Sequence, residues 1–252
     1  IEREDIPISE LTVALQCGGS DSYSGITANP ALGIASDMIV DHGGSSILSE
    51  TPEIYGAEHL LFERSLNKSN IHKIEKQIQW WKDYLHKNGS TMDNNPSPGN
   101  KRGGLTTILE KSLGAVAKSG TRKMVDVLDY AEKLKVKGFN FMNSPGYDPV
   151  SVTGQVASGA NIICFTTGRG SCFGFKPAPS IKIATNTNMF NKLKEDMDVN
   201  AGSIMDNEKS LDDVGKEIFN KILSVASGER SKSEINEYGD DEFNPWIIDP
   251  TL

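Results

Sequence analysis

The chain has 252 residues, of which 37% are hydrophobic and 24% charged, a composition that is ordinary for a globular protein with a substantial core. A net charge of −8 argues against a nucleic-acid-binding protein, because such proteins normally carry a basic face. No apolar run approaches the ~20 residues that a membrane span needs, so we expect neither a nucleic-acid partner nor a membrane role.

Cysteine usage indicates the cellular setting. Cys17, Cys164 and Cys172 are too few and too widely spaced for a disulfide framework or a zinc finger. Since the sequence also shows no signal-peptide pattern, a reducing, cytoplasmic location is the simplest interpretation. Residues 1–5 lack an initiator Met and resemble the middle of a longer protein, so we expect a fragment.

The first elements predicted along the chain are a strand, a helix and a second strand. Residues 11–15 form an apolar run that feeds a glycine turn, and residues 27–40 carry apolar side chains at helical spacing. Residues 45–49 predict the second strand. A strand–helix–strand unit of this kind favours a parallel, doubly wound sheet.

A long helix and an irregular loop follow. Residues 69–87 repeat apolar positions every three or four residues, which predicts a helix with one buried face. Only one of the adjacent Trp80 and Trp81 can face the core, and the other is expected at a boundary. Residues 94–104 hold Pro, Gly and Asn at a density that predicts no regular structure.

The second half of the chain continues the alternation of strands and helices. The expected elements are a helix over 105–118, strands over 123–128 and 138–142, a helix over 151–160, strands over 161–165 and 180–184, and a helix over 211–226. Residues 228–252 have few core-forming side chains and predict an extended C-terminal segment. The fold class is therefore α/β, one domain over residues 1–252 with a mostly parallel sheet and flanking helices, a Rossmann-like variant.

Four loops either follow the carboxyl ends of predicted strands or are unusually rich in Gly and Pro. They cover residues 17–25, 50–53, 95–104 and 166–171. Because ligands of open parallel sheets bind outside the carboxyl ends of the strands, these loops predict a polar site, although tight turns alone also explain glycine. The sequence lacks the spaced glycines of a Walker or dinucleotide motif, which makes a nucleotide-binding module a weak alternative.

Single residues in these loops carry open alternatives. Cys17 is a candidate thiolate or metal ligand, with an inert buried cysteine as the alternative, whereas Cys164 lies inside an apolar strand and is expected in the core. Arg169 suits bidentate capture of a carboxylate, but a structural arginine is equally compatible with the composition. His59 is the strongest histidine candidate because it closely follows Glu50 and Glu53. The other histidines fall near helix ends or on helix surfaces: His42, His72 and His86.

Several segments form blocks that are more specific together than alone. They are residues 16–21 with 24–30, residues 95–101 with 103–104 and 110–114, residues 165–170, and residues 181–186. In this order, from about Leu11 to Gly228, they resemble the signatures of the altronate/galactarate dehydratase family. Residues 50–58 and 144–148 are more similar to the altronate branch. Residues 171–174, Ser-Cys-Phe-Gly, depart from the more usual Thr-Pro-Tyr-Gly in a loop that we expect to border the pocket.

The resemblance implies the C-terminal catalytic part of a hydro-lyase. Such an enzyme uses iron(II), with Mn²⁺, Mg²⁺ or Ca²⁺ as possible replacements, to remove water from a sugar acid and give a 2-keto-3-deoxy acid. D-altronate is the expected substrate, and D-galactarate dehydration or sulfolactate cleavage are the alternatives. A homodimer through regions partly outside this chain is also expected. The competing class is an isolated, inactive domain that only binds anions.

The resemblance and the chemistry together suggest roles for individual residues. Proton transfer and carboxylate binding are assigned to Lys101, Arg169, Asp21 and Ser24. Lys101 is also an alternative base. Cys17 and Glu50 are the candidate metal ligands, with Asp21 as a further one, because thiolates suit iron and carboxylates suit many divalent ions. The expected substrate-binding residues are Gly18, Gly19, Ser20, Asn95, Ser97, Asn100, Thr167 and Gly170.

Overall fold

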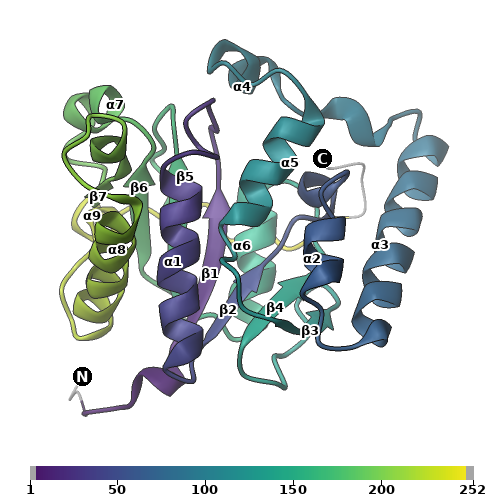
Figure 1. Ribbon diagram of the computed structural model, residues 1–252, viewed down its shortest axis with the longest axis horizontal. Helices are drawn as coiled ribbons and strands as arrows, with labels where there is room; N and C mark the ends of the chain where they lie inside the picture. Colours follow the sequence, from purple (N-terminus) through teal and green to yellow (C-terminus); the bar gives the residue numbers. More distant parts are fainter. Residues whose placement is uncertain (1–3, 248–252) are drawn as a thin grey trace.

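The computed structural model is built on a seven-stranded parallel sheet with helices on both faces (Figure 1). It describes residues 4–247, except for the side chain of Asn94. The strands are β1 Thr12–Cys17, β2 Ser45–Leu48, β3 Met124–Leu128, β4 Phe139–Met142, β5 Ile162–Thr167, β6 Ser180–Ala184 and β7 Val199–Asn200. The α-helices are α1 Ala28–Asp41, α2 His59–Glu63, α3 Lys68–Lys87, α4 Pro98–Arg102, α5 Ile108–Ala117, α6 Asp148–Ala157, α7 Thr187–Lys192, α8 Leu211–Ala226 and α9 Lys232–Ile235. Short 3-10 helices are η1 Ile8–Glu10, η2 Thr51–Ile54, η3 Met92–Asn94 and η4 Ala201–Ile204.

The strand order is β3-β4-β2-β1-β5-β6-β7, and every pairing is parallel. Without the edge strand β3, this order is that of the doubly wound Rossmann sheet, so the predicted fold class is confirmed. The chain runs from β1 toward one edge of the sheet and from β5 toward the other. The carboxyl ends of β1 and β5 therefore form the switch point, where ligands of such sheets bind.

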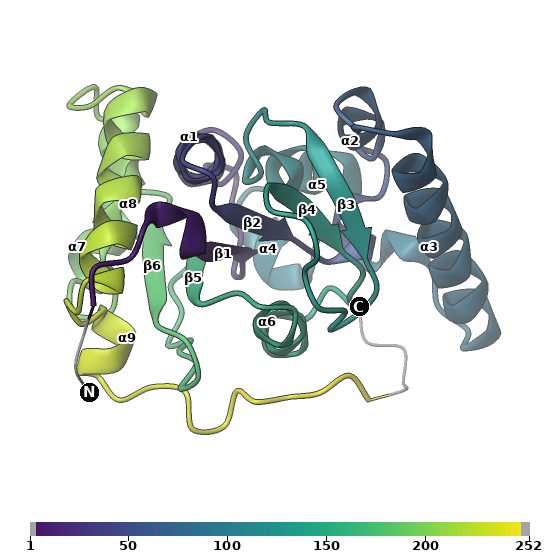
Figure 2. The same cartoon turned by 90° about the horizontal axis from the view of Figure 1, so that it is seen from below.

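The two faces of the sheet bury separate cores because successive side chains of a strand point to opposite sides. Val13 and Leu15 belong to the core beneath α1 and α8, whereas Ala14 belongs to the core that includes Val152 of α6. Figure 2 shows α1, α5 and α8 over one face and α6 over the other. Both layers leave the carboxyl edge of the sheet to loops and to α4 (Figure 1).

Most predicted elements are confirmed, and β6 and α8 match the sequence prediction to the residue. The prediction of no regular structure over residues 94–104 is wrong. Pro98 begins α4, and Ser97 and Asn100 close a reciprocal capping box at its start. Helix α6 begins at Asp148, three residues earlier than expected. Within residues 4–247 no helix is both long and apolar enough to cross a membrane.

The predicted extended C-terminal segment is partly correct, and its residues 248–252 lie outside the described part. Helix α9 interrupts it, and the stretch beyond α9 crosses below α6 toward α3 (Figure 2). Its Trp246 stacks on Trp81, with ring centroids 5.2 Å apart, so this polar segment still supplies one large core-contacting side chain. Trp81 is buried and Trp80 is 45% exposed, as the prediction for the adjacent tryptophans requires.

Candidate functional site

A cleft of about 220 Å³ opens at the carboxyl ends of β1 and β5. Each of the four loops singled out in the sequence contributes to it, and α5 and the start of α6 add further side chains. Its lining residues are Cys17, Gly18, Gly19, Ser20, Glu53, Asn95, Ser97, Asn100, Lys111, Gly146, Tyr147, Asp148 and Arg169. The sheet's switch point thus brings distant loops into one polar pocket.

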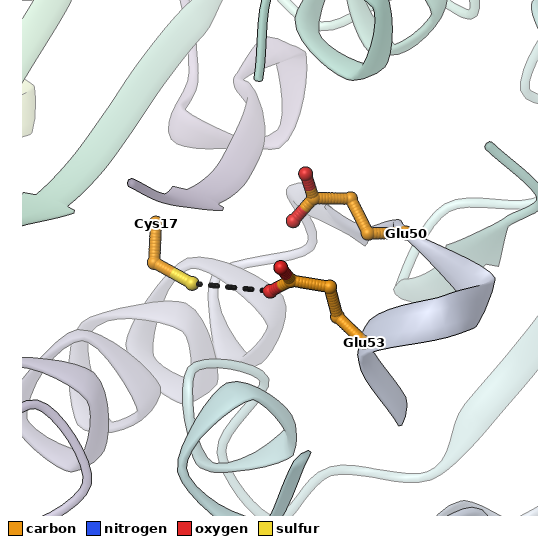
Figure 3. A group of neighbouring side chains, drawn as sticks. All are labelled: Cys17, Glu50 and Glu53. Carbon is orange, nitrogen blue, oxygen red and sulfur yellow. Dashed lines mark hydrogen bonds between the residues drawn. The ribbon is translucent and has the colours of Figure 1, made fainter. Parts of the chain in front are cut away.

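Cys17 and Glu53, which line the cleft, and Glu50, which lies behind them, point toward one another (Figure 3). Cys17 ends β1, and both glutamates lie at η2, directly after β2. One ligand atom from each residue lies within 4.8 Å of the others, and the Cys17 thiol donates to Glu53 Oε2 at 3.8 Å. All three side chains are buried.

Glu50 is the anomalous member of this group. It is 1% exposed, and neither of its carboxylate oxygens has a hydrogen-bond partner among the described residues. Its backbone has φ 74° and ψ 75°, a left-handed conformation that is uncommon for a non-glycine residue. Burial and repulsion from Glu53 raise the pKa of Glu50 well above its usual value. Burying an unpaired carboxyl group costs free energy, and a bound cation would offset that cost. The arrangement therefore indicates a cation-binding site.

Two lysines of α5 and its C-terminal cap provide positive charge next to the three acidic groups. Lys118 Nζ is buried and donates to Cys17 Sγ at 2.8 Å, and Lys111 pairs with Glu53. Burial alone would lower the pKa of Lys111, but Glu53 and Cys17 outweigh it and raise that pKa, so the amine stays protonated. Asn95 completes the group, since its Oδ1 accepts from Lys111 Nζ at 3.0 Å.

The donor set of one thiol and two carboxylates fits a divalent ion. Burial raises the pKa of Cys17 to about 11, with Lys118 opposing the shift, so the thiol is protonated until a cation replaces the proton. A thiolate favours a softer ion such as iron(II) over Mg²⁺ or Ca²⁺. The structure thus brings together the predicted ligands Cys17 and Glu50 and adds Glu53 to them.

Asp21, the further metal candidate, lies in a different environment. Its carboxylate accepts from Thr185 Oγ1 at 3.0 and 2.9 Å, from Asn186 Nδ2 at 3.1 Å, and from the predicted site residue Ser24 at 3.0 Å. A Cβ at Gly168 would overlap this carboxylate. Asp21 and Ser24 therefore join the loops after β1, β5 and β6, and neither lines the cleft.

The predicted cations and polar side chains separate into two groups. Arg169 lines the cleft rim and packs against Gly99, whereas Lys101 is exposed on α4 and does not line the cleft. Six of the predicted substrate-binding residues line the cleft: Gly18, Gly19, Ser20, Asn95, Ser97 and Asn100. Thr167 and Gly170 do not, because they close the turn that carries Arg169 through a Gly170 N–H to Thr167 Oγ1 hydrogen bond of 3.1 Å.

Other candidates lie away from the cleft. The four histidines are exposed: His42, His59, His72 and His86. The loop over residues 171–174 does not line the cleft, so the expectation that it borders the pocket is wrong. Cys164 is fully buried in the core, as predicted, and Cys172 is an exposed free thiol.

Sequence reasoning missed Lys111, Lys118 and Asp148. Lys111 and Lys118 are seven residues apart, which places them on one face of α5 two turns apart, and this spacing was the available signal. Asp148 lies in the segment 144–148, ahead of the predicted helix start at residue 151, and the actual start of α6 at Asp148 places its side chain at the cleft.

Residues 8–251 match the family described as D-galactarate/altronate dehydratase, C-terminal. An altronate dehydratase of Bacillus subtilis is 43% identical over 94% of this chain and 48% of its own length. A galactarate dehydratase (L-threo-forming) of Escherichia coli is 43% identical over 91% and 44%. The beta subunit of a (2R)-sulfolactate sulfo-lyase of Chromohalobacter salexigens is 34% identical over 93% and 61%. The chain spans about half the length of the dehydratases that it matches.

Proposed function

Because the chain belongs to the D-galactarate/altronate dehydratase C-terminal family, we propose that it carries the catalytic cleft of a sugar-acid hydro-lyase. The observation that carries this proposal is the buried Glu50, whose unpaired carboxyl group lies within 4.8 Å of the cleft residues Cys17 and Glu53. The reaction removes the hydrogen at C2 and the hydroxyl at C3 and leaves a 2-keto-3-deoxy acid. The cleft's polar lining and flanking cations suit such an anionic, hydroxyl-rich substrate.

Cys17, Glu50 and Glu53 would hold an iron(II) ion in this proposal. When bound, the ion would supply Lewis-acid polarisation of a substrate oxygen. Lys118 donates a hydrogen bond to the Cys17 sulfur, and Lys111 with Asn95 fixes the orientation of Glu53. These contacts keep the donor atoms in place before any ligand arrives, as supporting residues of metal sites commonly do.

The substrate carboxylate would lie between Arg169 at the rim and Lys111 deeper in the cleft. The hydrogen beside a carboxylate is only weakly acidic, so positive charge at this carboxylate must stabilise the enediolate-like charge that develops. Arg169 offers bidentate hydrogen bonds for orientation, and Lys111 offers a fixed point charge. Backbone N–H groups of the Gly18–Gly19 turn can add further donors.

D-altronate is the proposed substrate, on the sequence blocks over residues 50–58 and 144–148. The equal 43% identities to an altronate and a galactarate dehydratase leave the branch open, so D-galactarate is the second candidate. Sulfolactate is a third, because of the 34% identical sulfo-lyase subunit. A cytoplasmic location and a homodimer stay predictions.

The test is an anaerobic assay of the full natural chain with iron(II) and each of these three acids. We expect a 2-keto-3-deoxy acid from D-altronate and loss of its formation in Arg169→Ala. Arg102→Ala is the matched control, because Arg102 is exposed on α4 and does not line the cleft. Formation of sulfite from sulfolactate alone, or no product from any acid, contradicts the proposal.

A further inference from the structure

A carboxyl group that the cation cluster does not neutralise faces the cleft. Asp148, the first residue of α6, is partly buried and lines the pocket beside Gly146 and Tyr147. A Cβ at Gly18 would overlap its carboxylate, so this carboxylate lies directly against the glycine turn that follows β1. A substrate bound at that turn would therefore lie next to the Asp148 carboxylate.

The neighbours of Asp148 distinguish it from the other cleft carboxyl groups. Within residues 4–247, no lysine or arginine lies within 4.0 Å of its carboxylate, whereas Glu53 is paired with Lys111. Glu50 is also unpaired, but it does not line the cleft. Asp148 is thus the acidic side chain that both faces the cleft and lacks a cationic partner.

The charged groups around Asp148 come from η2 and α5, and an uncharged amide comes from β1. Glu53 of η2 and Glu50 at its start repel the ionised form, while Lys111 and Lys118 of α5 and its cap favour it, as does the amide of Gln16. Burial, followed by repulsion from Glu53, raises the pKa of Asp148 to about 7. A group with such a pKa can both accept and return a proton near neutral pH.

From its place in the cleft and its lack of a cation, we infer that Asp148 is the acid–base residue of the site. The inference rests on the proposed dehydration. The Asp148 carboxylate takes the proton from C2, and the electrons of the C2–H bond form a C2–C3 double bond as the C3–O bond breaks. The same proton then passes to the departing hydroxyl, which leaves as water. The resulting enol moves its hydroxyl proton to C3 through solvent and gives the 2-keto acid.

One carboxyl group therefore serves both proton transfers and ends in the state in which it began. This arrangement requires the C2 hydrogen and the C3 hydroxyl to leave from the same face of the substrate. It also leaves the ion-paired Glu53 without a proton-transfer role, in keeping with its contacts to Lys111 and Cys17.

The test uses the iron(II)-loaded full chain with D-altronate. Asp148→Ala is expected to lower kcat by at least about 100-fold, the usual contribution of a positioned acid or base, with little change in KM. Added formate, which can fill the space of the missing carboxyl group, is expected to restore part of the rate. Asp212→Ala, which removes an exposed aspartate of α8, is the matched control and should behave as wild type.

A pH profile adds a readout that a structural role would not change. The free enzyme must hold Asp148 ionised to accept the C2 proton, so kcat/KM of wild type should fall as the pH drops through the pKa of Asp148. In the formate-rescued variant this acidic limb should move toward the lower pKa of formic acid.

The outcomes separate the inference from the proposed function. If Asp148→Ala and Asp148→Asn both dehydrate altronate at near the wild-type rate, or if formate restores nothing to a folded variant, the inference is overturned. If wild type forms no keto acid from any of the three sugar or sulfo acids, the proposed function itself fails. Circular dichroism of both variants shows which of them are folded.

Discussion

Asp21 and Glu50 are two buried carboxyl groups that follow neighbouring strands at the same edge of the sheet, yet their surroundings are opposite. Asp21 accepts hydrogen bonds from Ser24, Thr185 and Asn186. Within residues 4–247, Glu50 has no hydrogen-bond partner at either carboxylate oxygen, and its backbone adopts a left-handed conformation. Burial is therefore not what distinguishes a functional carboxyl group from a structural one.

The difference lies in the groups that surround each carboxylate. The donors around Asp21 come from loops after β1 and β6, so its charge is used to hold the edge of the sheet together. Glu50 faces a thiol that donates to Glu53 instead, and a second carboxylate that only accepts. A buried charge of this kind costs several kcal/mol unless a cation or a proton compensates it. Asp21 should accordingly control stability, and Glu50 should control ligand binding.

The largest expected effect is on Asp21→Ala. Removing this carboxylate leaves the buried donors of Thr185 and Asn186 without an acceptor, so the free energy of unfolding should fall by about 3 kcal/mol. Urea denaturation followed by circular dichroism measures this change. Asp212→Ala, on the exposed face of α8, is the control and should change the free energy by less than about 0.5 kcal/mol. A loss of about 0.5 kcal/mol or less in Asp21→Ala would contradict its structural role.

The fold and this edge of the sheet were largely predictable from the sequence, because apolar runs ending at glycine turns are local signals. Cys17 and Arg169 could be placed at the site since both follow predicted strands, and strand ends meet at one edge of a parallel sheet. The partners of Asp21 could not be foreseen, because Thr185 lies 164 residues away and the β1–β5 and β5–β6 pairings together bring it close.

The two lysines of the site were harder to identify, because their spacing of seven residues indicates a shared helix face but not what that face contacts. A lysine on a helix is usually exposed, and nothing in one sequence shows that Lys111 and Lys118 face a buried group of acids. Asp148 was missed for a different reason: the helix start was placed three residues too late, so a first-turn residue was assigned to a turn. An error of three residues at a helix boundary was therefore enough to hide a residue of the cleft.

A second prediction concerns ion binding by Glu50→Gln. The variant keeps the shape of the side chain but removes the charge, so affinity for Co²⁺, used as a spectroscopic substitute for iron(II), should fall at least about 100-fold, or about 2.7 kcal/mol. Titration of the thiolate-to-cobalt charge-transfer band measures this affinity and reports on Cys17 directly. The metal-free variant should be at least as stable as wild type, because an unpaired buried acid has been neutralised.

Glu63→Gln is the matched control for this variant, since Glu63 is exposed at the end of α2. It should bind Co²⁺ as wild type does. Unchanged Co²⁺ affinity in Glu50→Gln, or a large loss of stability in the absence of metal, would remove the contrast between Glu50 and Asp21.

The smallest expected effect is on Ser24→Ala, which removes one of the donors to Asp21. Ser24 Oγ donates to Asp21 Oδ1 at 3.0 Å and accepts from the Asp21 backbone N–H, also at 3.0 Å. Because Thr185 and Asn186 remain as donors, the free energy of unfolding should fall by only about 1 kcal/mol. In the Asp21→Ala background the same substitution should cost less, since its main partner is gone, and a double-mutant cycle by urea denaturation measures this coupling. Equal costs in the two backgrounds would mean that Ser24 stabilises the loop independently of the Asp21 carboxylate.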